Sequence, residues 1–130
     1  MRTVAGGDLF DFGDADGDAD EARFQHPVGI AAGPRGSLLV ADTLNHKVKS
    51  LDPATGRVRT LLGDGRPFDA SLAALEHRSS LPPDLRSASA LREPEALLWT
   101  GRRILVVDTG NHRVVEVDPA TGGGDVWLGG

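Results

Sequence analysis

Two histidines occupy equivalent positions in this sequence, within Asn45-His46-Lys47 and Asn111-His112-Arg113. Each follows an aspartate by four residues, Asp42 in one place and Asp108 in the other. An imidazole beside carboxylate and carboxamide groups is typical of metal ligands and of general acid–base catalysts. A catalytic histidine seldom needs a second copy, however, so we favour a structural interpretation in which both histidines flank turns. Lys47 and Arg113 are then expected to be strand residues, each paired with a neighbouring carboxylate.

An acidic run at residues 11–21 offers a second kind of chemistry. Its alternating carboxylates suit calcium, a hard cation that takes many oxygen ligands, and the candidates are Asp14, Asp16, Asp18 and Asp20. The EF-hand pattern requires glycine at its sixth position and glutamate at its twelfth. Counted from Asp14, these positions hold Ala19 and Gln25. We therefore interpret the run as a solvated loop, with calcium as the alternative and no other cofactor expected.

No further catalytic constellation stands out. The sequence contains no nucleophile elbow, phosphate loop, zinc-ligand spacing or paired-carboxylate arrangement. It also contains no cysteine, which excludes disulfides, thiolate metal sites and thiol redox chemistry within these 130 residues. We assign no catalytic residue.

The elements that position these side chains are set by an internal repeat. Residues 40–56 and 106–122 are identical at 11 of 17 positions when offset by 66. In each copy a β-rich run, 37–40 or 103–107, leads into Asp-Thr-x-Asn, which has the composition of a tight turn. A second run follows, 46–51 or 112–117, and then Asp-Pro-Ala-Thr-Gly predicts a hairpin turn. Asp52 and Asp118 accept hydrogen bonds from that turn, and Gly56 and Gly122 supply its left-handed residue.

Flanking runs complete each copy. Residues 26–33 and 93–101 place a proline before a short apolar run, and residues 57–65 and 123–130 follow the hairpin turns. Each copy therefore carries four short strands over about 40 residues, which is typical of a propeller blade. The short Val-, Leu- and Ile-rich runs, interrupted by Gly, Pro, Asn and Asp, argue against helix.

The predicted fold is all-β, a partial β-propeller with two four-stranded antiparallel blades and an orphan N-terminal strand. Residues 1–6 are the outer strand of a preceding blade, 7–25 an acidic inter-blade loop, 26–65 blade 1, 66–92 an inserted loop and 93–130 blade 2. Within the insert, residues 69–78 favour helix with Asp69 as its N-cap. The insert is either a partner-binding projection or a surface loop without a role.

Two blades cannot close a ring, because propellers need about four to eight. We therefore expect a fragment of a longer propeller. A ring of several copies, such as three chains giving six blades, is the alternative, although the orphan strand counts against it.

The composition narrows the class of partner. The chain is 39% hydrophobic and 25% charged, with a formal net charge of -5. This charge disfavours nucleic acid, whose recognition needs clustered Lys and Arg. No apolar run approaches the roughly 20 residues that a membrane span needs, and no signal peptide is recognisable. We expect a cytoplasmic protein that contacts neither membrane nor nucleic acid.

Both copies of the repeat resemble NHL repeats, the β-propeller repeats named for an Asn-His-Leu signature. Asn45-His46-Lys47 and Asn111-His112-Arg113 stand at that signature and depart from it at the third residue. The segment VAGGDLFDFGDADGDADEARFQHPVGIA also resembles the connection between NHL blades. The resemblance covers most of the chain outside residues 66–92, and it is greatest to the propeller portion of proteins that join a thioredoxin-like domain to an NHL domain.

The resemblance implies a binding or scaffold module that holds loops in fixed positions, with a protein partner or missing blades as its contacts and self-association as a further option. Propellers host unrelated activities, so two alternatives stay open. One is part of a metal-dependent lyase or hydrolase. The other is the propeller part of a thioredoxin-linked redox protein.

Overall fold

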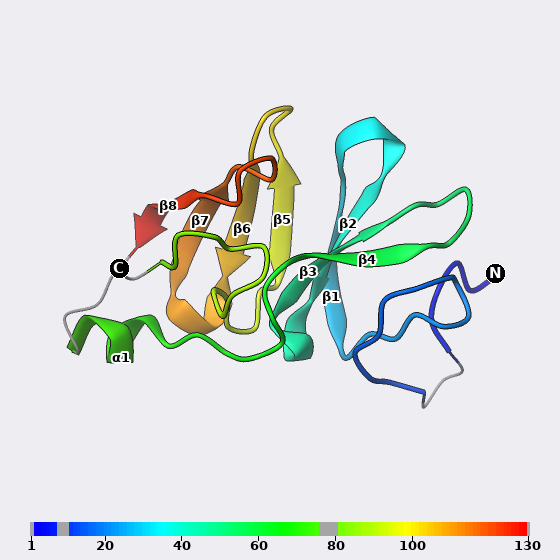
Figure 1. Ribbon diagram of the computed structural model, residues 1–130, viewed down its shortest axis with the longest axis horizontal. Coiled ribbons are helices and arrows are strands. Elements are labelled where there is room, and N and C mark those ends of the chain that lie inside the picture. Colours follow the sequence, from blue (N-terminus) through cyan, green and yellow to red (C-terminus); the bar gives the residue numbers. More distant parts are fainter. Residues whose placement is uncertain (1, 8–10, 76–80, 130) are drawn as a thin grey trace.

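A computed structural model describes residues 2–7, 11–75 and 81–129, and it contains two separate four-stranded antiparallel sheets (Figure 1). Blade 1 has the order β1-β2-β3-β4, with β1 Pro27–Ala32, β2 Leu38–Asp42, β3 Lys47–Leu51 and β4 Val58–Leu62. Blade 2 has the order β5-β6-β7-β8, with β5 Ala96–Trp99, β6 Ile104–Asp108, β7 Arg113–Val117 and β8 Gly124–Gly129. These sheets confirm the predicted all-β, partial-propeller fold.

Short helical turns connect the strands. They are η1 Pro34–Gly36, η2 Thr43–Asn45, η3 Thr109–Asn111 and the α-helix α1 Ala70–Leu75. None of the described helices has the length and apolar character that crossing a membrane requires.

The second, third and fourth strands share one register in the two blades, whereas the first strand is shifted by one residue, because Val40 pairs with Ile30 but the equivalent Val106 pairs with Leu97. Leu38 pairs with Leu51 between β2 and β3. Ile104 and Val117, which stand 66 positions after these two residues, pair between β6 and β7. The outer strand pairs each carry an irregularity at the same place, after Val48 in blade 1 and after Val114 in blade 2. From its second strand onward, the repeated sequence therefore builds a repeated unit, including the bulge in the outer strand pair.

The repeated turn after β3 and β7 follows from its residues. Asp52 Oδ1 accepts a 2.9 Å hydrogen bond from the Ala54 N–H, and Asp118 Oδ1 accepts the same bond from Ala120. Gly56 and Gly122 close the turns with φ of 78° and 77°, a region that glycine enters without steric cost.

Each blade has two faces, because side chains alternate along a strand. Face B of blade 1 carries Leu39, Ala41 and Val48, and face A carries Val40, Leu51 and Val58. In blade 2, face A carries Ile104, Val106, Val115 and Val117, and face B carries Leu105, Val107 and Val114.

The main core lies between the blades. Side chains of blade 1, of blade 2 and of the segment that joins them form one buried cluster, made of Leu39, Val48, Leu62, Leu85, Ala90, Leu91, Ile104, Val106, Val115 and Val117. Face B of blade 1 therefore packs on face A of blade 2. Each blade thus covers an apolar face of the other.

The first strands of the blades, β1 and β5, lie side by side at this interface (Figure 1). A Cβ atom at Gly29 would stand 2.3 Å from the carbonyl oxygen of Glu95 and 3.2 Å from the Cα of Ala96. The glycine of the Pro-x-Gly sequence is thus required by the close approach of two backbones.

Residues 2–7, which comprise residues 2–6 of the predicted outer strand at 1–6 and the residue after it, are described but are not assigned to a strand. They nevertheless contact the connection before blade 1 as the residue after β4 contacts the connection before blade 2. The Gly6 N–H donates to Ala19 O at 2.8 Å, as the Gly63 N–H donates to Leu85 O at 2.9 Å. Ala5 packs on a second core, on face A of blade 1, formed by Ala22, Val40, Leu51 and Val58.

The described parts of the segment 66–92, residues 66–75 and 81–92, lie before blade 2 as residues 11–25 lie before blade 1. The Phe68 N–H donates to Leu91 O, as the Gly13 N–H donates to Phe24 O. Asp69 caps α1 by accepting a hydrogen bond from the Leu72 N–H at 3.0 Å. The predicted helix spanned 69–78, and its residues 76–78 lie outside the described residues. The segment is a longer inter-blade connection, and its later part enters the main core.

Candidate functional site

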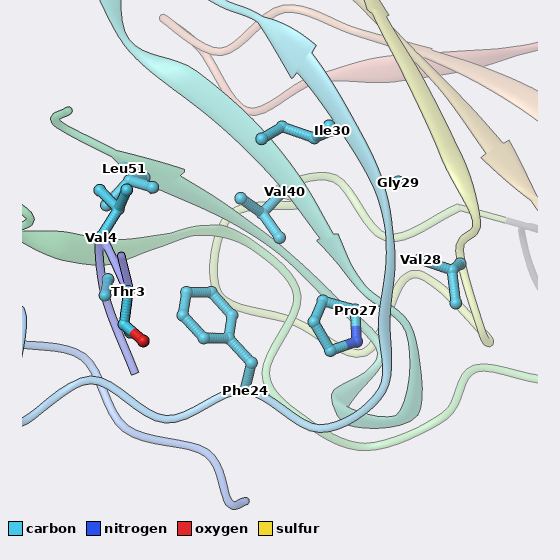
Figure 2. A pocket seen from close by; sticks show the side chains of 10 residues that line it. Thr3, Val4, Phe24, Pro27, Val28, Gly29, Ile30, Val40 and Leu51 are labelled. Atoms are coloured by element: carbon cyan, nitrogen blue, oxygen red, sulfur yellow. The ribbon is translucent and has the colours of Figure 1, made fainter. Parts of the chain in front are cut away.

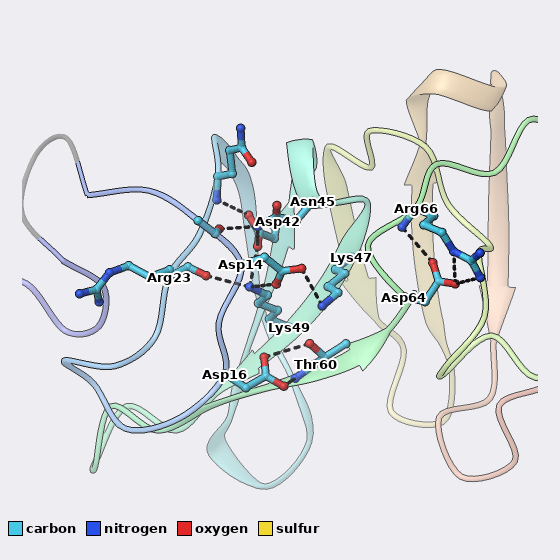
Figure 3. A network of polar contacts seen from close by, with 12 residues as sticks. Asp14, Asp16, Arg23, Asp42, Asn45, Lys47, Lys49, Thr60, Asp64 and Arg66 are labelled. Carbon is cyan, nitrogen blue, oxygen red and sulfur yellow. Dashed lines mark hydrogen bonds and ion pairs between the residues drawn. The ribbon is translucent and has the colours of Figure 1, made fainter.

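The Asp-Thr-x-Asn turn of blade 1 is held by a fully buried carboxylate. Asp42 Oδ1 accepts a hydrogen bond from the Gln25 N–H at 2.8 Å, and its Oδ2 accepts one from Asn45 Nδ2 at 2.8 Å. Oδ2 also pairs with Lys49 Nζ at 2.8 Å (Figure 3). Asp42 therefore ties the turn, the strand β3 and the preceding connection together.

Lys49 has no exposed surface, and several groups of the protein stabilise its charge. Its ammonium group pairs with Asp42 and with Asp14 at 2.9 Å, and it donates to Arg23 O at 2.8 Å. The ring of Phe24 lies 5.2 Å away, within cation–π range. A buried cation requires such partners, because removing it from water is costly.

Blade 2 also pairs the buried aspartate of its turn with a buried cation, but the cation stands at another position of the strand. Arg113 Nε pairs with the buried Asp108 at 2.9 Å, and its Nη2 donates to Ala90 O at 3.0 Å. Its guanidinium lies 5.4 Å from the centroid of the Phe68 ring. Asp108 Oδ1 accepts a hydrogen bond from the Arg92 N–H at 2.7 Å. The cation of blade 2 thus comes from the first residue of its strand, whereas that of blade 1 comes from the third.

The signature asparagines anchor the inter-blade connections. Asn45 Nδ2 donates to Gly13 O at 2.7 Å, and Asn111 Nδ2 donates to Phe68 O at 2.8 Å. Asn111 Oδ1 also accepts from the Ala70 N–H at 3.0 Å, at the start of α1. Each asparagine therefore joins its own turn to the segment that precedes its blade.

The two histidines adopt the same backbone but have different surroundings. His46 and His112 have φ of 56° and 54°, the left-handed region that ends the turns η2 and η3. His46 Nδ1 accepts a 3.0 Å hydrogen bond from the Glu93 N–H, just before β5. His112 is exposed and makes no such bond among the described residues.

Thr43 supports the contact that His46 makes. Its Oγ1 donates to Pro94 O at 2.8 Å, so two side chains of the first signature turn hold the chain entering β5. The described part of the chain shows no equivalent partner for Thr109 or His112. The structure thus places the first signature turn at a blade–blade junction.

Burial lowers the pKa of His46 from 6.5, while Glu93 and Asp108 oppose the shift and Arg92 adds to it. The unfolded chain therefore binds more protons than the folded chain as the pH falls below about 6.5. Stability is unaffected by this group above that pH, decreases as the pH falls toward the lowered folded pKa, and then levels off. We expect urea unfolding to show this decrease in the wild type and in His112→Asn, but not in His46→Asn. An identical pH profile for all three chains would contradict the assignment.

Carboxylates of the acidic run pair with donors of the protein and do not gather around one point. Asp14 pairs with Lys47 at 2.8 Å as well as with Lys49, and Asp16 accepts bonds from the Thr60 N–H and hydroxyl at 2.7 and 2.9 Å (Figure 3). Asp18 pairs with Arg57 at 2.8 Å, whereas the exposed Asp20 has no such partner among the described residues. No group of three or more His, Asp or Glu among the described residues could hold a metal ion.

Burial raises the pKa of Asp14, but hydrogen bonds from Lys47 and Lys49 outweigh it and lower the pKa overall. Three of the four calcium candidates, Asp14, Asp16 and Asp18, are therefore engaged by protein donors. We expect the melting temperature to be unchanged when calcium chloride or EDTA is added. A rise with calcium that EDTA reverses, and that Asp16→Asn removes, would restore the calcium hypothesis.

Two hollows stand out on the surface of the described residues. An apolar hollow of about 390 Å³ lies on face A of blade 1, where Val4, Phe24, Val40 and Leu51 surround it (Figure 2). A larger groove of about 650 Å³ lies between the two blades, where their hairpin turns meet. It is lined by arginines from four separate segments and by Trp99. Sequence reasoning missed this groove because its residues are spread from position 34 to position 120.

Sequence comparison finds relatives along most of this chain. The NHL repeat family matches residues 24–49. The chain is 36% identical over 124 residues to Protein SUPPRESSOR OF QUENCHING 1, chloroplastic, of Arabidopsis thaliana, which covers 90% of this chain and 11% of that protein. It is 36% identical over 116 residues to NHL repeat-containing protein 2 of Bos taurus, which covers 87% and 14%. The chain therefore spans about a seventh or less of these relatives.

Solved structures share the fold. A putative phosphatase from Bacteroides thetaiotaomicron has a TM-score of 0.62 at 22% identity, covering 86% of this chain and 25% of that one. An auxiliary nutrient binding protein from Bacteroides ovatus has a TM-score of 0.59 at 24% identity, covering 83% and 26%. With two matching blades, two signature turns and these relatives, the chain belongs to the NHL-repeat family.

Proposed function

We propose that this chain is a binding scaffold within a larger NHL propeller, and that its two open faces pack against further blades. In this role the chain supplies no chemistry of its own. It holds turns and loops at fixed positions, and a partner contacts them. The relatives support this reading, because their matched regions are a small part of much longer chains.

The observation that carries the proposal is a difference between equivalent positions. Leu39 and Val48 on face B of blade 1 are fully buried by blade 2. Their equivalents on face B of blade 2, Leu105 and Val114, are half-buried, and Val107 is 39% exposed. Blade 2 thus presents the apolar surface by which blade 1 holds its neighbour, and exposed apolar patches of this kind mark interaction sites.

The polar residues point the same way. Thr43 and His46 of blade 1 hold the chain entering β5. Thr109 and His112 stand at the same positions of blade 2 without such a partner in the described part of the chain. Thr109, His112 and the apolar face B therefore all lie on the same side of blade 2, where no described residue covers them.

The signature residues favour a scaffold over a catalytic centre. Asp42, Asp108, Asn45 and Asn111 each join a turn to a strand or to a connection through hydrogen bonds. No buried side-chain nitrogen or oxygen among the described residues lacks a hydrogen-bond partner. Groups that are satisfied internally make the fold rigid, and rigidity is what a binding scaffold needs.

A charge on the open face tests the proposal. Val107→Lys is compared with Leu44→Lys, because Val107 and Leu44 are 39% and 40% exposed and only Val107 lies on face B of blade 2. We expect the wild-type chain to self-associate with rising concentration in sedimentation velocity and to bind an apolar dye. Val107→Lys should reduce both signals and Leu44→Lys should leave them unchanged. A wild-type chain without either signal, or equal effects of the two substitutions, would contradict the proposal.

A further inference from the structure

The groove between the blades has the size of a ligand site. Its volume of about 650 Å³ falls within the range of roughly 300–1,000 Å³ found for ligand pockets. Both blades line it through their turns, at Pro34, Arg35, Ser37 and Asp52 on one side and at Gly101 and Asp118 on the other. The groove therefore exists only because the two blades pack together.

Its charge is opposite to that of the whole chain. Arg35, Arg59, Arg86 and Arg102 line the groove, whereas its acidic residues are Asp52 and Asp118. Arg86 pairs with Asp84 at 2.9 Å, and Asp118 is met by Arg103 at 3.6 Å. The chain as a whole carries a net charge of -5. A local excess of arginine on an acidic protein attracts anionic partners.

Three of these arginines are free to bind. The guanidinium groups of Arg35, Arg59 and Arg102 make no hydrogen bond or ion pair among the described residues. They come from the turn after β1, from β4 and from the turn after β5, so they approach the groove from separate elements. A guanidinium offers a planar fork of donors that fits a carboxylate with two hydrogen bonds.

Arg35 stands where glycine would be the easier residue. Its φ is 55°, in the left-handed region, and the residue 66 positions on is Gly101, with φ of 96°. A residue with a Cβ atom is destabilised in this region relative to glycine. Arg35 thus holds a charged side chain at the tip of its turn in a conformation that glycine would adopt at a lower cost to fold stability.

We propose that this inter-blade groove binds an acidic peptide segment of a protein partner. Carboxylates of the peptide pair with Arg35, Arg59 and Arg102, and an apolar side chain packs against Trp99, which is half-buried in the wall of the groove. This inference rests on the proposed scaffold function and names the chemistry of the partner.

A peptide fits the groove better than a polyphosphate does. Asp52 lies among the arginines, so closely spaced negative charges would meet repulsion there, whereas carboxylates spaced along a peptide can avoid it. The hydroxyl of Ser50 also lines the groove and makes no described hydrogen bond, so it is available to the peptide backbone.

The test uses a labelled oligoglutamate peptide and the intact chain. Binding is measured by fluorescence anisotropy, and separately by the emission of Trp99 in a Trp127→Phe background, because the chain has two tryptophans. We expect Arg59→Ala and Arg102→Ala to weaken binding about tenfold each. Arg66→Ala removes an equal charge from an arginine outside the groove that is paired with Asp64, and it should leave the affinity unchanged.

Arg35→Gly separates binding from folding. It should weaken peptide binding about tenfold. The melting temperature should stay the same or rise, because glycine suits the left-handed backbone. The proposal is overturned if the peptide does not bind, or if Arg66→Ala weakens peptide binding as much as Arg59→Ala does. It is also overturned if inorganic phosphate changes the Trp99 emission at concentrations as low as the peptide needs. None of these variants touches Val107, so failure here leaves the test of the open blade face intact.

Discussion

Asp42→Ala is expected to lower the free energy of unfolding by about 3–5 kcal/mol, the usual cost of removing one partner from a buried ion pair. The substitution leaves Lys49 buried without its nearest full charge, and it removes the acceptor of the bonds from Gln25 and Asn45. Asp14 remains beside Lys49 but is partly exposed and is shared with Lys47. The measurement is urea unfolding followed by circular dichroism.

The control is another aspartate of the same chain. Asp18→Ala breaks the exposed pair with Arg57 and should change stability by less than about 1 kcal/mol. The double substitution of Asp42 by alanine and Lys49 by methionine should recover part of the loss, because it removes both buried charges. If Asp42→Ala costs no more than Asp18→Ala, the buried pair does not stabilise blade 1.

Leu39→Ala and Leu105→Ala should differ strongly, although the repeat makes the two positions equivalent. Leu39 is fully buried between the blades, and truncating such a leucine costs about 2–5 kcal/mol. Leu105 is half-buried on the open face of blade 2, so its truncation should cost about 1 kcal/mol or less in the isolated chain. Both variants are measured by urea unfolding at low protein concentration, where association is weakest.

The comparison of these two leucines also reports on the open face. When a further blade or another copy of the chain covers this face, Leu105→Ala should lower the free energy of unfolding by nearly as much as Leu39→Ala does. Equal costs in the dilute, monomeric chain would show that face B of blade 2 is already covered, against the packing described here.

The sequence was sufficient to predict the blades. Strands of four to six residues alternate between two faces, and Asp-Pro-Ala-Thr-Gly closes a turn that needs a left-handed residue at Gly56 and Gly122. These are local rules, so one sequence could reveal them. The repetition at an offset of 66 added the information that the second and third strands of both units pair in one register.

The buried cations could not be predicted, because they depend on contacts between distant segments. The sequence indicated Lys47 and Arg113 as equivalent partners of carboxylates, and both are paired in this way. The buried cation of blade 1, however, is Lys49, whose equivalent in blade 2 is the apolar Val115. Which position faces the carboxylate depends on Phe24 and the connection before the blade, which lie 25 residues away.

The equivalence of the two inter-blade connections was hidden by their lengths. The anchoring bonds join residues 13 and 24 in the first connection and residues 68 and 91 in the second. The longer segment therefore resembled an insertion in the sequence. Only the three-dimensional contacts show that both begin and end against the same parts of their blades.

The most direct test of the account is an NMR measurement of the contact between the blades. The backbone of Gly29 in β1 lies against Glu95 and Ala96 at the start of β5. We predict a nuclear Overhauser effect between the Hα protons of Gly29 and Ala96, together with the cross-strand effects expected within each sheet. Intact cross-strand effects in both sheets without any effect between residues 27–32 and 93–99 would show two separate units, and would contradict the packed pair of blades.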